Sequence, residues 1–87
     1  MRYEIDYLET VVKKDIPALP KTAWQRIKKA IQERLTSNPI ELGKPLRYSL
    51  KGARRLRVGD YRVIYKIELP ATVLIVKIGH RKEVYED

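Results

Sequence analysis

Apolar and acidic positions alternate with a period of two in the first segment of the chain, Tyr3–Leu8. This alternation predicts a strand with one buried face. From Glu9–Ile16 the apolar side chains change to a near-helical spacing, and Pro17 follows directly. Because proline cannot continue a helix interior, this segment is predicted to be one short helix.

A second, longer helix is predicted to begin at Pro20, which suits the first turn of a helix. Its apolar positions fall on one stripe, at Ala23, Ile27, Ala30, Ile31 and Leu35. The segment Thr36–Pro39 ends it, because a residue before proline is driven out of the helical region. The two helices form a hairpin whose apolar seam must bury against another layer.

The second half of the chain contains four strand-like runs, separated by connections of hairpin length. They are Leu46–Leu50, Arg54–Val58, Tyr61–Glu68 and Thr72–Ile78. Gly59 and Asp60 supply a two-residue turn between the middle runs. The expected fold class is α+β: an N-terminal strand, a helical hairpin, then a four-stranded antiparallel meander, with the helices packed on one face of the sheet. Without repeats or linkers, residues 1–87 are expected to form a single domain.

Strand parity separates apolar from basic side chains. In the run Tyr61–Glu68 the residues Tyr61, Val63, Tyr65 and Ile67 share one face. If the helices cover that face, the opposite, uncovered face receives a basic set: Arg55, Arg57, Arg62 and Lys66. Like charges on neighbouring strands cost about 0.2–1 kcal/mol per pair, a cost that a bound anion would offset. The alternative is that these are ordinary solvent-facing positions.

Charge strengthens the anion interpretation. The net charge is +8, and residues 44–82 carry eleven Lys and Arg against only Asp60 and Glu68. A basic half of this kind is typical of a protein with a phosphate-bearing or strongly acidic partner. The alternative to a binding surface is a solvated basic surface that maintains solubility.

Composition excludes several other classes. The chain has no Cys and one His, so disulfides, Cys-ligated zinc and thiol nucleophiles are excluded, and no metal or other cofactor is expected. No signal peptide is expected, and no apolar run approaches the roughly 20 residues of a membrane span. A cytoplasmic domain without a membrane partner is therefore expected.

The last apolar run leads into a short constellation, His80-Arg81-Lys82, with Tyr85 close behind. Taken alone, a single His after a strand is more often a surface residue, and a Tyr near a terminus more often packs. The basic sheet face nearby favours a functional role for both residues over a surface or packing role.

The whole chain resembles the RelE/ParE superfamily of bacterial and archaeal toxins, and its RelE branch in particular. The resemblance rests on the run Arg55-Leu56-Arg57-Val58-Gly59-Asp60-Tyr61-Arg62-Val63-Ile64-Tyr65 and on the downstream His80-Arg81 with Val84-Tyr85. It implies a toxin that cuts mRNA in the ribosomal A site, without a metal, and so stops translation. Such chemistry needs a base, an acid, in-line geometry and cations around a phosphorane, in which the RNA 2′-OH attacks its own 3′-phosphate.

The resemblance also implies residue roles. Arg62 matches the arginine at the scissile phosphate, and Arg81 matches a second phosphate-stabilising cation. Tyr85 matches a tyrosine that orients the 2′-OH, stacks on a base or shares in proton transfer. Arg55 falls where many members carry a Lys or Arg that takes part in catalysis or binds the RNA backbone.

Two positions depart from the family pattern. His80 stands where the better-studied members carry Lys, and because imidazole changes charge near neutral pH it is a candidate general base. Ala53 stands where some members place a lysine, so that cationic role is absent or moved to Arg54 or Lys51. The basic side chains expected to bind RNA are Lys51, Arg54, Arg57, Lys66 and Lys82.

The partners implied by the resemblance are mRNA, the ribosome with its 16S rRNA, and an acidic RelB-like antitoxin, as a heterotetramer. Val11 and Val12 of the first helix either contribute to antitoxin docking or pack in the core. The main rival function is that of the ParE-like branch, which inhibits DNA gyrase and cuts no RNA; its members tend to lack the set Arg62, His80, Arg81 and Tyr85. A non-catalytic RNA-binding module is a second rival, but Tyr61 and Tyr65 are expected to face inward, which leaves no stacking platform.

Overall fold

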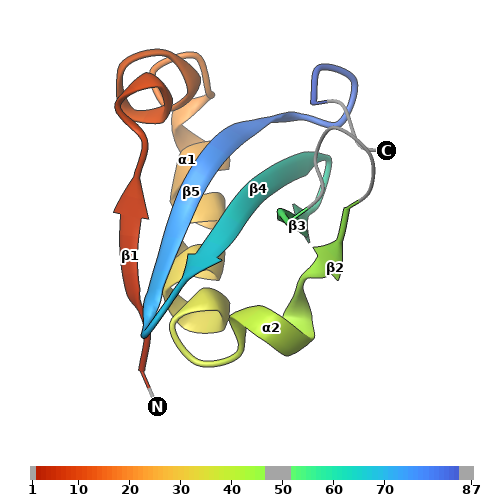
Figure 1. Ribbon diagram of the computed structural model, residues 1–87. Coiled ribbons are helices and arrows are strands. Elements are labelled where there is room, and N and C mark those ends of the chain that lie inside the picture. Colours follow the sequence, from red (N-terminus) through yellow and green to blue (C-terminus); the bar gives the residue numbers. More distant parts are fainter. Residues whose placement is uncertain (1, 47–51, 85–87) are drawn as a thin grey trace.

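The computed structural model describes residues 2–46 and 52–84 as a twisted sheet with helices packed against one side (Figure 1). The elements in chain order are β1 (Glu4–Tyr7), η1 (Val11–Asp15), α1 (Lys21–Ala30), η2 (Ile31–Leu35), α2 (Pro39–Leu42), β2 (Lys44–Pro45), β3 (Arg54–Val58), β4 (Tyr61–Glu68) and β5 (Thr72–His80). Among the described residues, no helix is long and apolar enough to cross a bilayer.

The five strands lie in the order β1-β5-β4-β3-β2. The strands from β2 to β5 pair antiparallel with their chain neighbours, which confirms the predicted meander. The N-terminal strand β1 joins the edge of β5 and runs parallel to it. A parallel pair requires a long crossover, and the helices between β1 and the meander provide it.

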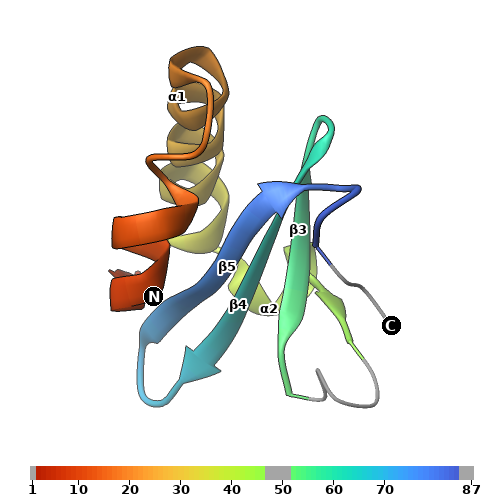
Figure 2. The same ribbon diagram turned by 90° about the horizontal axis from the view of Figure 1, so that it is seen from above.

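The long helix is confirmed where the apolar stripe predicted it. α1 continues directly into η2, a π-helical turn, and buries Ile27, Ala30, Ile31 and Leu35 against the sheet (Figure 2). The first helix is a π-helical turn, η1, in which the N–H of Ile16 donates to the carbonyl oxygen of Val11 at 2.9 Å. Val11 of η1 packs in the same core as Ile27 of α1, so η1 lies on the same side of the sheet as α1.

The segment before β3 differs from the sequence-based prediction. A four-residue helix, α2, begins at Pro39, and the paired part of the next strand is only Lys44–Pro45. The predicted strand Leu46–Leu50 is therefore wrong at its start, because Leu46 comes after the last residue of β2. The N–H of Leu46 still donates to the carbonyl oxygen of Ala53. The rest of that run, residues 47–50, lies outside the described residues.

The main core lies between the sheet and the helices. It gathers Val11, Leu35, Val63, Tyr65 and Ile75, all fully buried, with their neighbours from every layer. The Tyr65 hydroxyl donates to the carbonyl oxygen of Pro39 at 2.5 Å and lies over Gly43. A Cβ on Gly43 would come within 1.7 Å of that hydroxyl oxygen, so only glycine allows this close approach.

The opposite face of the sheet is not bare. A second, smaller apolar cluster forms there from Leu46, Ala53, Ile64 and Val84, with Val76 packed against it. Val84 comes from the segment after β5, which turns back over this face: its Cγ2 lies 2.8 Å from where a Cβ of Gly79 would be. The expectation of a wholly uncovered face is therefore wrong, because part of it holds apolar side chains that pack on one another.

Candidate functional site

Three arginines share the face of the sheet opposite to the helices, as strand parity predicted. Arg57 of β3 lies directly across from Arg62 of β4, and Arg55 lies across from Ile64 on the same face. Lys66 follows Ile64 by two residues and is exposed. We call Arg55, Arg57, Arg62 and Lys66 the arginine face. Two guanidinium groups in directly opposed positions repel each other, which favours an anion between them.

Arg62 is the buried member of this face. Only 8% of its surface is exposed, whereas Arg57 is exposed and Arg55 is partly buried. Its Nη1 donates to the carbonyl oxygens of Gly59 at 3.0 Å and Tyr61 at 2.9 Å. A buried guanidinium needs such acceptors to offset its desolvation, and these two also fix its orientation.

The turn between β3 and β4 holds a second arginine as well. The backbone N–H of Arg81 donates to the carbonyl oxygen of Asp60 at 2.7 Å. Its Nε lies 3.8 Å from Oδ1 of the Asp60 carboxylate. Gly59 makes the turn possible with a φ of +58°, which confirms the predicted two-residue turn. Three successive carbonyl groups of one turn, those of residues 59 to 61, therefore bind Arg62 and Arg81.

His80 points to the other face of the sheet. It lies across from Tyr61, and the two rings meet edge to face with centroids 5.5 Å apart, whereas Arg62 lies across from Gly79. A bulge at Val76 causes this, since Ile64 pairs with Lys77 but Tyr65 pairs with Ile75. One extra residue reverses the side of every later side chain in the strand, so the structure does not bring His80 to the arginine face.

The His80 ring is held in one orientation by its own turn. Its Nδ1 accepts a hydrogen bond from the backbone N–H of Lys82 at 3.2 Å. Nδ1 is therefore the unprotonated nitrogen of the neutral ring, and Nε2 carries the proton. In this tautomer His80 offers a donor at Nε2, which is the opposite of what a general base needs.

Arg54 lies on the helix-covered face, away from the other arginines. It pairs with Tyr65, and its Nη1 donates to the carbonyl oxygens of Ile40 at 2.9 Å and Gly43 at 3.0 Å. Burial raises the pKa of Tyr65 to about 12, and the nearby Arg54 charge partly opposes that rise. Arg54, which the sequence grouped with the RNA-binding residues, thus ties α2 to the sheet.

Two predicted site residues, Lys51 and Tyr85, lie outside the described residues, so the structure places neither of them. Lys82 is exposed in the turn after β5. Within residues 2–46 and 52–84, no three His, Asp or Glu side chains gather as a metal site would require.

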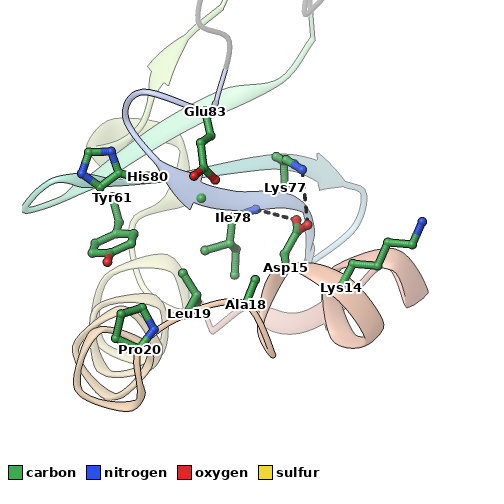
Figure 3. A pocket seen from close by; sticks show the side chains of 11 residues that line it. Lys14, Asp15, Ala18, Leu19, Pro20, Tyr61, Lys77, Ile78, His80 and Glu83 are labelled. Atoms are coloured by element: carbon green, nitrogen blue, oxygen red, sulfur yellow. Dashed lines mark hydrogen bonds and ion pairs between the residues drawn. The ribbon is translucent and has the colours of Figure 1, made fainter.

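A pocket of about 280 Å³ lies beside this turn, on the helix side of the sheet (Figure 3). Tyr61 and His80 form one wall, and Glu83 reaches toward it from above. Across the pocket, the Asp15 carboxylate accepts from the N–H of Ile78 at 3.0 Å and pairs with Lys77 at 3.3 Å. These contacts tie η1 to β5 and fix one side of the pocket.

Sequence reasoning used Asp60 only as a turn residue and missed its contacts with Arg81. The available signal was the Gly59-Asp60 pair between two strands, which placed the start of β4 beside the end of β5. It could not show that two carbonyl groups of the turn accept from the Arg62 guanidinium, or that a third accepts from the backbone N–H of Arg81.

The chain matches the family model of the ParE toxin of the type II toxin–antitoxin system parDE over residues 7–85. Toxin RelG of Mycobacterium tuberculosis is 32% identical over 77 residues, which is 87% of this chain and 88% of the relative. Among solved structures, the RelBE2 toxin–antitoxin complex of M. tuberculosis has a chain with a TM-score of 0.85 at 30% identity, covering 95% of both chains. The isolated RelE toxin of E. coli has a TM-score of 0.72 at 23% identity, covering 90% of this chain and 83% of that chain, which is a likeness of fold.

Proposed function

This chain belongs to the RelE/ParE superfamily of type II toxins, and on that premise we propose that it is a ribosome-dependent endoribonuclease that cuts mRNA in the ribosomal A site. The cut stops translation. The observation that carries the proposal is the arrangement of three arginines: Arg57 faces Arg62 directly, and one turn holds both Arg62 and Arg81.

The proposed reaction is an attack of the RNA 2′-OH on the adjacent 3′-phosphate, with departure of the 5′-oxygen. Negative charge builds on the non-bridging phosphate oxygens in the transition state. Fixed cations stabilise that charge without reorganising, and one such donor is worth about 2.7–4 kcal/mol. Arg62 and Arg81 are the proposed phosphate ligands. The turn holds the guanidinium of Arg62 by hydrogen bonds; it holds Arg81 by a backbone hydrogen bond and by the contact of its guanidinium with Asp60.

The other cations bind the RNA strand in this proposal. Arg55 and Arg57 lie on the same face as Arg62 and contact the phosphates on either side of the cut. Lys66 extends the face along β4, and Lys51 and Lys82 supply further backbone contacts. Arg54 is left out of this set because it lies on the helix-covered face, across from Tyr65.

Proton transfer is assigned to Tyr85, carried over from the family resemblance. The tautomer of His80 and its position opposite to the arginine face argue against a role as the base at this phosphate. Asp60 is proposed as a positioning residue, because its carboxylate contacts the Arg81 guanidinium without lying on the arginine face itself.

An acidic antitoxin is the proposed protein partner. Solved relatives of this chain occur in RelB–RelE complexes, such as that of Methanococcus jannaschii at 29% identity. A chain of net charge +8 suits an acidic partner. Val12 is half-exposed beside the fully buried Val11, so one of the two valines is left available for such docking.

Primer extension on a reporter mRNA tests the proposal, with and without translating ribosomes. The variants are Arg81→Ala and, as a matched control, Arg2→Ala, which is exposed at the opposite end of the sheet. We expect ribosome-dependent cuts for the wild type and Arg2→Ala, and cutting slowed by about 10²–10³-fold for Arg81→Ala. Translation arrest without any cut would show that the proposal is wrong. A gyrase supercoiling assay would then test the rival function, that of the ParE-like branch.

A further inference from the structure

The pocket beside Tyr61 and His80 has no role in the phosphate chemistry proposed above. It lies on the helix side of the sheet (Figure 3), at the end of β5, which Arg81 follows in the chain. Its volume of about 280 Å³ lies just below the range of about 300–1,000 Å³ that is typical of small-ligand sites. A single aromatic heterocycle is therefore a suitable occupant in size.

The shape of the pocket suits a flat ring. Leu19 and Pro20 from the segment before α1 form an apolar side, and Ile78 forms the floor. The ring planes of Tyr61 and His80 meet at 81°, so the two rings form two nearly perpendicular aromatic walls. Unstacked RNA bases bind to proteins on such aromatic surfaces, with their edges free for hydrogen bonds.

Three side chains of the pocket present polar groups to a neutral ligand: those of Glu83, His80 and Tyr61. Asp15 and Lys77 neutralise each other, and Lys14 points away from the pocket in Figure 3. The Glu83 carboxylate reaches toward the pocket and makes no ion pair within the part of the chain that the structure describes. His80 offers a donor at Nε2–H, because its Nδ1 accepts from the N–H of Lys82.

We propose that this pocket receives one base of the RNA and selects bases that carry an exocyclic amino group over uracil. An amino group donates to the Glu83 carboxylate, as amino protons of cytosine do to Glu and Asp in other complexes. The neighbouring ring nitrogen or carbonyl accepts from His80. Uracil has a single ring N–H flanked by two carbonyl oxygens. When that N–H donates to the Glu83 carboxylate, the two carbonyl oxygens lie near the carboxylate oxygens and repel them.

This inference rests on the proposed function for its substrate. His80 precedes Arg81 in the chain, so the pocket and the proposed phosphate ligand are adjacent at one end of the sheet. A nucleotide with its phosphate at Arg81 has its base within reach of the pocket. His80 is then a residue of base recognition, and this explains its position on the face opposite to Arg62.

The direct test is an NMR titration of the purified toxin with cytidine and uridine monophosphates. The two probes share sugar and phosphate and differ only at the base edge. We expect the cytidine nucleotide to bind three- to tenfold more tightly, as one or two hydrogen bonds imply, with shifts at His80 and Tyr61. In Glu83→Gln the preference disappears or reverses, because an amide also donates to uracil. In His80→Phe the flat ring remains and the preference falls.

The control is Glu68→Gln, an exposed carboxylate at the far end of β4, which leaves the preference unchanged. Equal binding of the two nucleotides by the wild type, no binding, or the same loss in Glu68→Gln would overturn the proposal. The titration needs no ribosome, so its result is independent of RNA cleavage. A preference that Glu83→Gln abolishes, in a toxin that cuts no RNA, would support the pocket while the proposed function fails.

In a toxin that cuts RNA, primer extension on an mRNA with randomised bases around the cut gives a second reading. Wild-type cuts avoid uracil at one position; Glu83→Gln removes that avoidance, whereas the control Glu68→Gln keeps it. A wild type that tolerates uracil at every position around the cut would contradict the assignment.

Discussion

The two faces of the sheet use the same strands in different ways. On the helix-covered face, Val63 and Tyr65 of β4 are fully buried in the main core. On the arginine face, Arg62 of the same strand is bonded to the turn, and only a small apolar cluster lies around it. One strand thus gives stability on one side and presents charge on the other. Because alternate side chains belong to different faces, changes to one face are expected to leave the other largely intact.

The sharpest test of this separation uses neighbouring residues of β5 that face opposite sides. Ile75 is fully buried in the main core, whereas Val76 is partly buried against the small cluster. We expect Ile75→Ala to lower the free energy of unfolding by about 2–5 kcal/mol, because it leaves a cavity in a dense core. Val76→Ala should cost clearly less. Urea denaturation of both variants checks this, and equal losses would contradict the view that one face carries the stability.

The converse effect is expected for Arg81→Ala. The Arg81 side chain is 56% exposed, so its loss should change the free energy of unfolding by no more than about 0.5 kcal/mol. Loss of a phosphate-stabilising cation should slow RNA cleavage by about 10²–10³-fold. Single-turnover cleavage on programmed ribosomes measures the rate, and thermal unfolding measures the stability. A large fall in melting temperature would show that Arg81 has a structural role instead.

A smaller effect, confined to the covered face, is expected at high pH. Burial raises the pKa of Tyr65 to about 12 from the ordinary value of 10.0, so the folded state holds the neutral hydroxyl. The stability that results is complete below pH 10 and is lost as the pH rises toward 12, because the unfolded chain releases its proton first. We expect the wild-type free energy of unfolding to fall more steeply between pH 10 and 12 than that of Tyr65→Phe. Parallel slopes would mean that the Tyr65 hydroxyl titrates alike in both states.

The smallest effect is expected at Asp60. Its contact with Arg81 is an exposed ion pair, worth about 0.2–1 kcal/mol, so Asp60→Ala should slow cleavage by at most about fivefold. High salt should shrink the difference, because it screens exposed charges. If Asp60 acts only through Arg81, the double variant Asp60→Ala/Arg81→Ala cuts no more slowly than Arg81→Ala. Faster cleavage by Asp60→Ala would show that the carboxylate competes with the RNA phosphate.

Much of the fold could be predicted because local patterns and tertiary packing agree. The stripe from Ile27 to Leu35 and the alternation through β4 each have one buried face, and both lie in the structure where the sequence put them. The segment around β2 could not be predicted in the same way. There, Gly43 is required by the Tyr65 hydroxyl above it, a contact between residues 22 positions apart.

The candidate site was predictable only in part, for a similar reason. The shared face of Arg57 and Arg62 follows from alternation in two regular strands. The position of His80 does not, because alternation from Ile75 would put it on the arginine face. The bulge at Val76 reverses that parity, and no feature of the local sequence distinguishes a bulged strand from a regular one.

The contacts of the β3–β4 turn have a consequence for how the sequence of this protein can change. The turn binds Arg62 and the backbone of Arg81 through main-chain carbonyl groups, which every amino acid possesses. Amino-acid substitutions at residues 59 to 61 therefore do not remove these hydrogen-bond acceptors. What the turn must preserve is its path, and at Gly59 that path needs a φ of +58°. The placement of both arginines is thus encoded in the shape of the backbone, with one glycine as its main chemical requirement.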